Sequence, residues 1–102
     1  MTTTKIDDYE VMYSSNTFVP RIWLRSGGKF IGQLIFEHNG SALPPDNLVN
    51  GQVNLYYHLE DYENALDLLR NIHNTPVYLF YVGSGWGNEN GLVTSVELAG
   101  GG

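Results

Sequence analysis

The sequence predicts a protein of the α+β class, in which one amphipathic helix packs on a strongly curved, mainly antiparallel sheet of five to six strands. Three observations predict this class. Most of the chain consists of short β-rich runs separated by turn residues, only the segment 59–72 has helical periodicity, and the short connections favour antiparallel hairpins. The expected order of elements is strand, strand, strand, strand, helix, strand, strand, within a single domain over residues 1–102.

Length and composition are consistent with one domain. The chain has 102 residues, and its 42% hydrophobic and 13% aromatic content is enough for one core. Residues 1–5 and 99–102 are expected to be disordered tails. Because the chain lacks both a long apolar stretch and a signal-peptide pattern, we expect a soluble, cytoplasmic protein with no membrane contact. With no cysteine it has no thiolate metal ligand, and we expect no metal and no cofactor.

The first half of the chain predicts three strands. Residues 9–13 alternate between apolar and polar, as a strand with one buried face does. The runs 18–24 and 30–36 flank Gly27 and Gly28, a favoured pair for a two-residue hairpin turn. Extending this turn as a regular ladder places Leu24 opposite Ile31 and Trp23 opposite Gly32. One face then carries Pro20, Ile22, Leu24, Ile31 and Ile35, and the other carries Arg21, Trp23, Arg25, Phe30, Gly32 and Leu34.

The second half predicts a strand, the helix and a final pair of strands. Residues 38–51 are dense in turn formers and form the longest expected irregular stretch, and 52–57 alternate again. Over 59–72 one helical stripe is mainly apolar and consists of Leu59, Tyr62, Leu66, Leu69 and either Ile72 or His73. The runs 77–82 and 92–98 are expected as strands, the first of them central in the sheet.

The excess of apolar residues on the strands points to a partner. Apolar and aromatic residues occupy both faces of several strands, which is more than one helix can cover. The sheet is therefore expected either to curl on itself or to bury its second face against another copy of the chain, as a homodimer.

Basic residues are concentrated in one segment of an acidic chain. The net charge is −6, so binding to nucleic acid is not expected, yet three of the five basic residues lie between Arg21 and Lys29. Arg21, Trp23 and Arg25 at strand spacing present two guanidinium groups beside an indole, which suits a small anionic ligand or an acidic protein segment. The alternative is a solvated face on which the arginine stems cover the ring. The acidic start of the helix, with Glu60, Asp61 and Glu63, offers a counterpart within the chain or on a second copy.

The loop 83–91 is the second candidate contact site. It contains four glycines and Trp86, but the segment after it is a strand, so no helix N-terminus is available to hold a phosphate. We consider Trp86, Asn88 and Asn90 as candidates for binding a ligand or partner. The alternative is that Trp86 folds back onto the sheet. The histidines and paired carboxylates are interpreted as structural or solvated, so no catalytic residue is assigned.

The stretch 21–34 resembles in outline the first motif of the Sm-like RNA-binding proteins, in which two strands meet at a glycine turn and a second glycine permits strong bending. The resemblance covers fourteen residues, and no later stretch matches the second motif of that family. In the family a helix precedes this hairpin, whereas a strand is expected here. No RNA-binding residue is therefore carried over.

Two functional hypotheses follow. The preferred one is a noncatalytic binding or assembly module that forms a homodimer through the uncovered sheet face. The other is a small-molecule-binding protein or small enzyme, with a pocket between the curved sheet and the loops 38–51 and 83–91.

Overall fold

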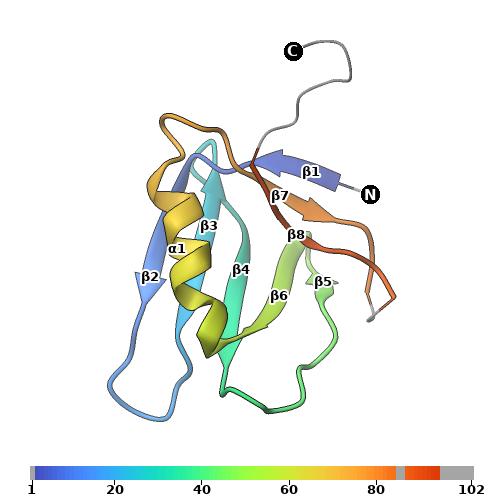
Figure 1. The fold of residues 1–102 in the computed structure, drawn as a ribbon. Coiled ribbons are helices and arrows are strands. Elements are labelled where there is room, and N and C mark those ends of the chain that lie inside the picture. The colour runs from blue at the N-terminus through green and yellow to red at the C-terminus, as the bar shows by residue number, and fades with distance from the viewer. Residues whose placement is uncertain (1, 85–86, 95–102) are drawn as a thin grey trace.

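Two sheets and one helix make up the α+β fold, seen in a computed structural model that describes residues 2–84 and 87–94 (Figure 1). The strands are β1 (Thr2–Lys5), β2 (Asp8–Met12), β3 (Arg21–Ser26), β4 (Lys29–Glu37), β5 (Asn47–Val49), β6 (Gln52–His58), β7 (Tyr78–Tyr81) and β8 (Gly91–Val93). A 3₁₀ turn η1 (Leu59–Asp61) leads directly into the helix α1 (Tyr62–Arg70). The predicted α+β class and mainly antiparallel pairing are confirmed. The strands are divided, however, between a five-stranded sheet ordered β2-β3-β4-β6-β5 and a three-stranded sheet ordered β1-β7-β8.

The N-terminal residues form a strand where the sequence analysis expected a disordered tail. Thr2–Lys5 pair with β7 in antiparallel register, from Thr2 opposite Tyr81 to Lys5 opposite Tyr78. Ile6, only 1% exposed, fixes the end of this strand, and its N–H donates to the Val77 carbonyl (2.9 Å). A run of threonines has no apolar alternation, so its pairing depends on a strand more than seventy residues away. The other expected tail, 99–102, lies outside the described residues.

The stretch 38–51, expected as irregular, contains the short strand β5. Asn50 and Gly51 both have positive φ, at 53° and 78°, as the two central residues of a type I′ turn require. This turn folds β5 antiparallel onto β6. The same stretch provides the long connection that lets β6 run parallel to β4, from Gly32 opposite Val53 to Glu37 opposite His58.

The predicted register of the β3–β4 hairpin is wrong beyond its first two pairs. Ser26 lies opposite Lys29 as expected, but a bulge follows between Leu24 and Arg25. The additional residue places Leu24 opposite Gly32 and Trp23 opposite Gln33. The bulge moves Gly32 and Leu34 to the buried side of the sheet, whereas Trp23 and its arginine neighbours stay on the other side as predicted.

Both covering layers lie on the same face of the five-stranded sheet. One core joins side chains of β3, β4 and β6 to those of α1 and of the small sheet, namely Ile6, Ile22, Leu24, Leu34, Phe36, Val53, Leu55, Ala65, Leu66, Leu69, Ile72, Val77, Leu79 and Tyr81. The predicted inward stripe of the helix is confirmed at Leu66 and Leu69. Figure 1 shows α1 in front of β3, between β2 and β4, with the small sheet to its right. Among the described residues no element covers the opposite face, which we call the outer face.

Candidate functional site

The outer face is defined by the cross-strand register. Pairing places residues of β2, β3, β4 and β6 side by side, with their side chains alternating away from the core. The outer-face residues are Asp8, Glu10 and Met12 on β2, Arg21, Trp23 and Arg25 on β3, Phe30, Gln33 and Ile35 on β4, and Asn54 and Tyr56 on β6. The structure therefore brings together Arg21, Trp23 and Arg25, which the strand spacing had placed on one face.

Trp23 lies at the centre of an aromatic patch on this face. Its indole is half-buried and meets Phe30 edge to face, with ring centroids 6.1 Å apart at 80°. Trp23, Phe30 and Arg25 line a shallow pocket of about 230 Å³. At the other end of β3, the Arg21 guanidinium lies over the exposed ring of Phe18, 5.8 Å from its centroid. The patch thus presents aromatic surface with one arginine at each end.

The charges of the outer face form two adjacent strips of opposite sign. Asp8 and Glu10 lie on the edge strand β2, opposite Arg25 and Trp23 of β3, and Arg21 at the other end of β3 lies opposite Met12. Arg25 forms an ion pair with Glu10, and the buried Nε of Arg21 has no hydrogen-bond partner in the described part of the chain. The acidic helix start lies on the covered side of the sheet, so it does not meet these arginines within one chain.

The side-chain amides of Asn88 and Asn90, two candidates of the loop 83–91, form hydrogen bonds within the chain. Asn90 Oδ1 accepts from the N–H groups of Val82 (2.7 Å) and Gly83 (3.4 Å), while its Nδ2 donates to the Gly83 carbonyl (3.0 Å) and to Asp46 Oδ2 (3.0 Å). Asn88 Nδ2 donates to the Ser84 carbonyl (2.8 Å). These bonds hold the loop closed and tie it to the 38–51 segment. Trp86, the remaining candidate of this loop, lies outside the described residues.

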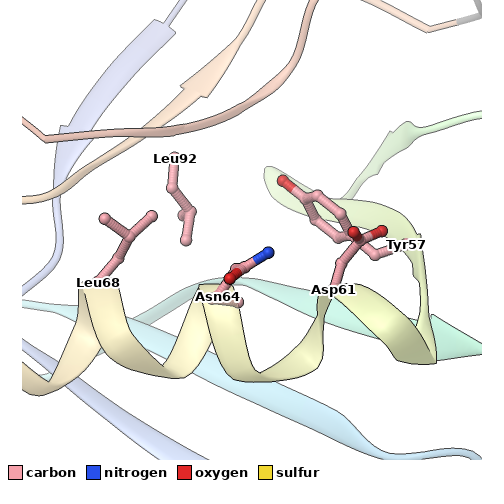
Figure 2. A pocket seen from close by; sticks show the side chains of 6 residues that line it. Tyr57, Asp61, Asn64, Leu68 and Leu92 are labelled. Carbon is pink, nitrogen blue, oxygen red and sulfur yellow. The ribbon is translucent and has the colours of Figure 1, made fainter.

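A second cavity lies between the helix and the small sheet, on the covered side (Figure 2). Its volume is about 270 Å³, and we call it the Tyr57 pocket. It is lined by Tyr57 from β6, by Asp61 of η1, by Asn64, Ala65 and Leu68 from α1, and by Leu92 from β8. In Figure 2, Leu68 and Leu92 lie together at one end, and Tyr57 and Asp61 lie at the other.

The Tyr57 hydroxyl is held in its protonated form. Burial raises the pKa of Tyr57 to about 12, and the nearby carboxylates of Asp46 and Asp61 contribute by disfavouring a further negative charge. The ring stacks on Phe36, with centroids 5.8 Å apart at 24°. At neutral pH the Tyr57 hydroxyl is therefore an uncharged hydrogen-bond donor that lies near the carboxylates of Asp46 and Asp61.

The raised pKa of Tyr57 predicts a loss of stability in alkali. An unfolded tyrosine ionises near pH 10, whereas folded Tyr57 keeps its proton up to about pH 12, so folding is weakened as the pH rises between these values. We expect a loss of up to about 2 kcal/mol at the end of this window. Denaturant titrations of wild type and Tyr57→Phe at pH 9 and pH 11.5 check this, because the variant lacks the ionising group. An equal loss in both proteins would show that other groups cause the alkaline destabilisation.

Sequence reasoning found the outer-face patch but missed the Tyr57 pocket. The alternation of 52–57 placed Tyr57 on the same side as Val53 and Leu55, which is the side it occupies. Nothing in the pattern showed that Leu92 would face it, because this contact depends on how the second sheet sits on the first. The alternative hypothesis placed a pocket between the sheet and two loops, whereas this cavity lies beside α1.

Two further findings apply to the described residues. None of their helices is long and apolar enough to cross a membrane. In residues 2–84 and 87–94, histidine and carboxylate side chains form no group of three that could hold a metal ion.

Comparison of the chain with protein-family models, with curated proteins and with solved structures gives no match. The outline resemblance of residues 21–34 to the Sm-like hairpin thus depends on the glycine turn and the bend alone.

Proposed function

We propose that this protein is a noncatalytic assembly module that forms a homodimer by stacking two outer faces around a two-fold axis. One observation carries the proposal: α1 and the small sheet both cover the same face of the five-stranded sheet, and the opposite face holds Trp23 and Phe30 without a cover in the described chain. Interfaces between proteins are enriched in aromatic residues and arginine, and tryptophan often dominates their binding energy.

The arrangement of charges favours a second copy as the partner. In a two-fold dimer each surface meets its own copy, so a self-complementary surface is required. The acidic strip of Asp8 and Glu10 lies beside the basic strip of Arg21 and Arg25. Rotating one copy by 180° about an axis between these strips places each acidic strip over the basic strip of the other copy. The same face therefore supplies both halves of the contact.

A small anionic ligand or an acidic segment is less well supported as the partner. Arg25 is already paired with Glu10, and the acidic strip next to it would repel an anion. Phosphate backbones of nucleic acids meet the same repulsion. Binding of an acidic partner can be distinguished from dimerisation by experiment, because such a partner would bind a protein that stays monomeric on its own.

Sedimentation equilibrium tests the proposal. We expect wild type to dimerise in the micromolar range and Trp23→Ser to weaken dimerisation at least tenfold, because a central aromatic contact is lost. Leu48→Ser is the matched control, since Leu48 is 50% exposed on the other side of the sheet, opposite Val53. It should dimerise like wild type. A wild-type protein that stays monomeric at 100 micromolar, or equal effects of both substitutions, would refute the proposal.

A further inference from the structure

The Tyr57 pocket is separate from the proposed dimer face. It lies between α1, β6 and β8, on the covered side of the five-stranded sheet. Its volume of about 270 Å³ is close to the lower end of the range for small-molecule sites, so it suits a ligand with few non-hydrogen atoms. Dimerisation through the outer face would leave it open.

One end of the pocket is apolar. Leu68 of α1 and Leu92 of β8 form its walls there, and Figure 2 shows the two leucine side chains directed toward each other. These residues come from two layers that are far apart in the sequence. This end would hold a small hydrocarbon group by burying its surface.

The other end of the pocket is polar and negative. Asp61 and Asn64 project from the helical segment toward the side on which Tyr57 lies (Figure 2). Asp61 and Asp46 both lie close enough to the Tyr57 hydroxyl to raise its pKa. Among the residues that line the cavity no side chain is positively charged.

Within residues 2–84 and 87–94, Asp61 has no ion-pair partner that would neutralise it. It stands immediately before α1, a position at which aspartate often caps a helix, but its side chain makes no cap hydrogen bond. The ion pairs found among the described residues involve Glu10, Glu63 and Asp67 instead. The carboxylate is therefore free to accept hydrogen bonds from a molecule in the pocket.

We propose that the Tyr57 pocket binds a small primary amine carried on an apolar body, with the ammonium group at Asp61 and the hydrocarbon between Leu68 and Leu92. Charge-assisted hydrogen bonds to a carboxylate are about twice as strong as neutral ones. The Asn64 amide supplies a further polar contact beside the ammonium group. An anionic ligand of the same size would meet the Asp61 carboxylate without a compensating cation.

Calorimetric titration with three matched probes tests this inference. We expect phenethylamine to bind wild type with a Kd on the order of 0.1–1 mM, a range that fits a ligand of few atoms. We expect 3-phenylpropionate, the anionic analogue, not to bind, and phenethyl alcohol to bind at least tenfold more weakly than the amine. Asp61→Asn should weaken amine binding at least tenfold, because the charge is lost while the shape is kept.

Asp67→Asn is the control for the charge of the helix, because Asp67 is an exposed carboxylate of α1 that does not line the pocket. It should bind the amine like wild type. Thermal melts of both variants show that they are folded. Equal weakening in both variants, binding of the anion as tight as that of the amine, or no saturable binding of the amine at 10 mM would overturn the inference. None of these outcomes depends on whether the protein dimerises.

Discussion

Replacing Phe36 by alanine is expected to lower the free energy of unfolding by about 3–5 kcal/mol. Phe36 on β4 is fully buried and joins the sheet to the helix. Its ring stacks on Tyr57 of β6 and meets Tyr62 of α1 edge to face, with centroids 5.1 Å apart. Removing it leaves a cavity between two layers that cannot close without moving the helix. Small domains have only about 5–15 kcal/mol of stability in total, so this loss is severe.

Phe18→Ala is the matched control for Phe36→Ala. The same atoms are removed, but Phe18 is 62% exposed, and among the described residues its ring has an aromatic interaction only with the Arg21 guanidinium. We expect a loss below about 1 kcal/mol. Urea denaturation followed by circular dichroism measures both. If Phe36→Ala does not fold, Phe36→Leu can be measured instead. We expect it to lower the free energy of unfolding by an amount between those of Phe18→Ala and Phe36→Ala. Similar midpoints for the two alanine variants would contradict the described core.

Replacing Gly32 by alanine is expected to lower the free energy of unfolding by about 2–3 kcal/mol. A Cβ atom at this position would lie 2.5 Å from the backbone oxygen of Val53 and 3.2 Å from its Cβ. The obstacle is backbone of the neighbouring parallel strand, so no side-chain rotation can relieve it. The two central strands must separate locally, which also disturbs the bulge opposite Leu24.

Gly87→Ala is the control for Gly32→Ala. A Cβ there meets no atom of the described residues within 4 Å, so the substitution should change stability by less than about 0.5 kcal/mol. Denaturant midpoints measure both, and amide hydrogen exchange shows where the first variant is weakened. We expect faster exchange in β4 and β6 but not in α1. A Gly32→Ala protein as stable as wild type would mean that these two strands do not approach as described.

Local patterns predicted the parts of the fold that depend on neighbours in the sequence. The glycine pair at 27–28, the helical stripe and the exposed Arg21, Trp23 and Arg25 are all of this kind. The bulge was not predicted, because Ile31 continues the apolar run and gives no sign of being the additional residue. The Asn50–Gly51 turn did carry a recognised hairpin signal. This signal predicts that the residues on either side of the turn pair as antiparallel strands, as β5 and β6 do. The parallel pairing of β6 with β4 is a long-range contact that the turn does not determine.

The parts that were not predicted depend on contacts far apart in the sequence. β1 is a strand only because β7 offers a free edge, and its own residues carry no alternation. The Tyr57 pocket forms where β8 approaches α1, and the position of Leu92 follows from the packing of two sheets. The uncovered outer face was predicted more successfully. The strands carry more apolar residues than one helix can cover, and this excess can be seen in the sequence.

A charge-reversal experiment tests the proposed dimer most directly. Glu10→Arg makes the outer face predominantly basic, and Arg25→Glu makes it predominantly acidic. We expect each variant alone to sediment as a monomer, because like charges then face each other across the two-fold axis. We expect their equimolar mixture to sediment as a dimer, since the predominantly basic face of one variant then meets the predominantly acidic face of the other. A mixture that stays monomeric under conditions in which wild type dimerises would contradict stacking of the outer faces.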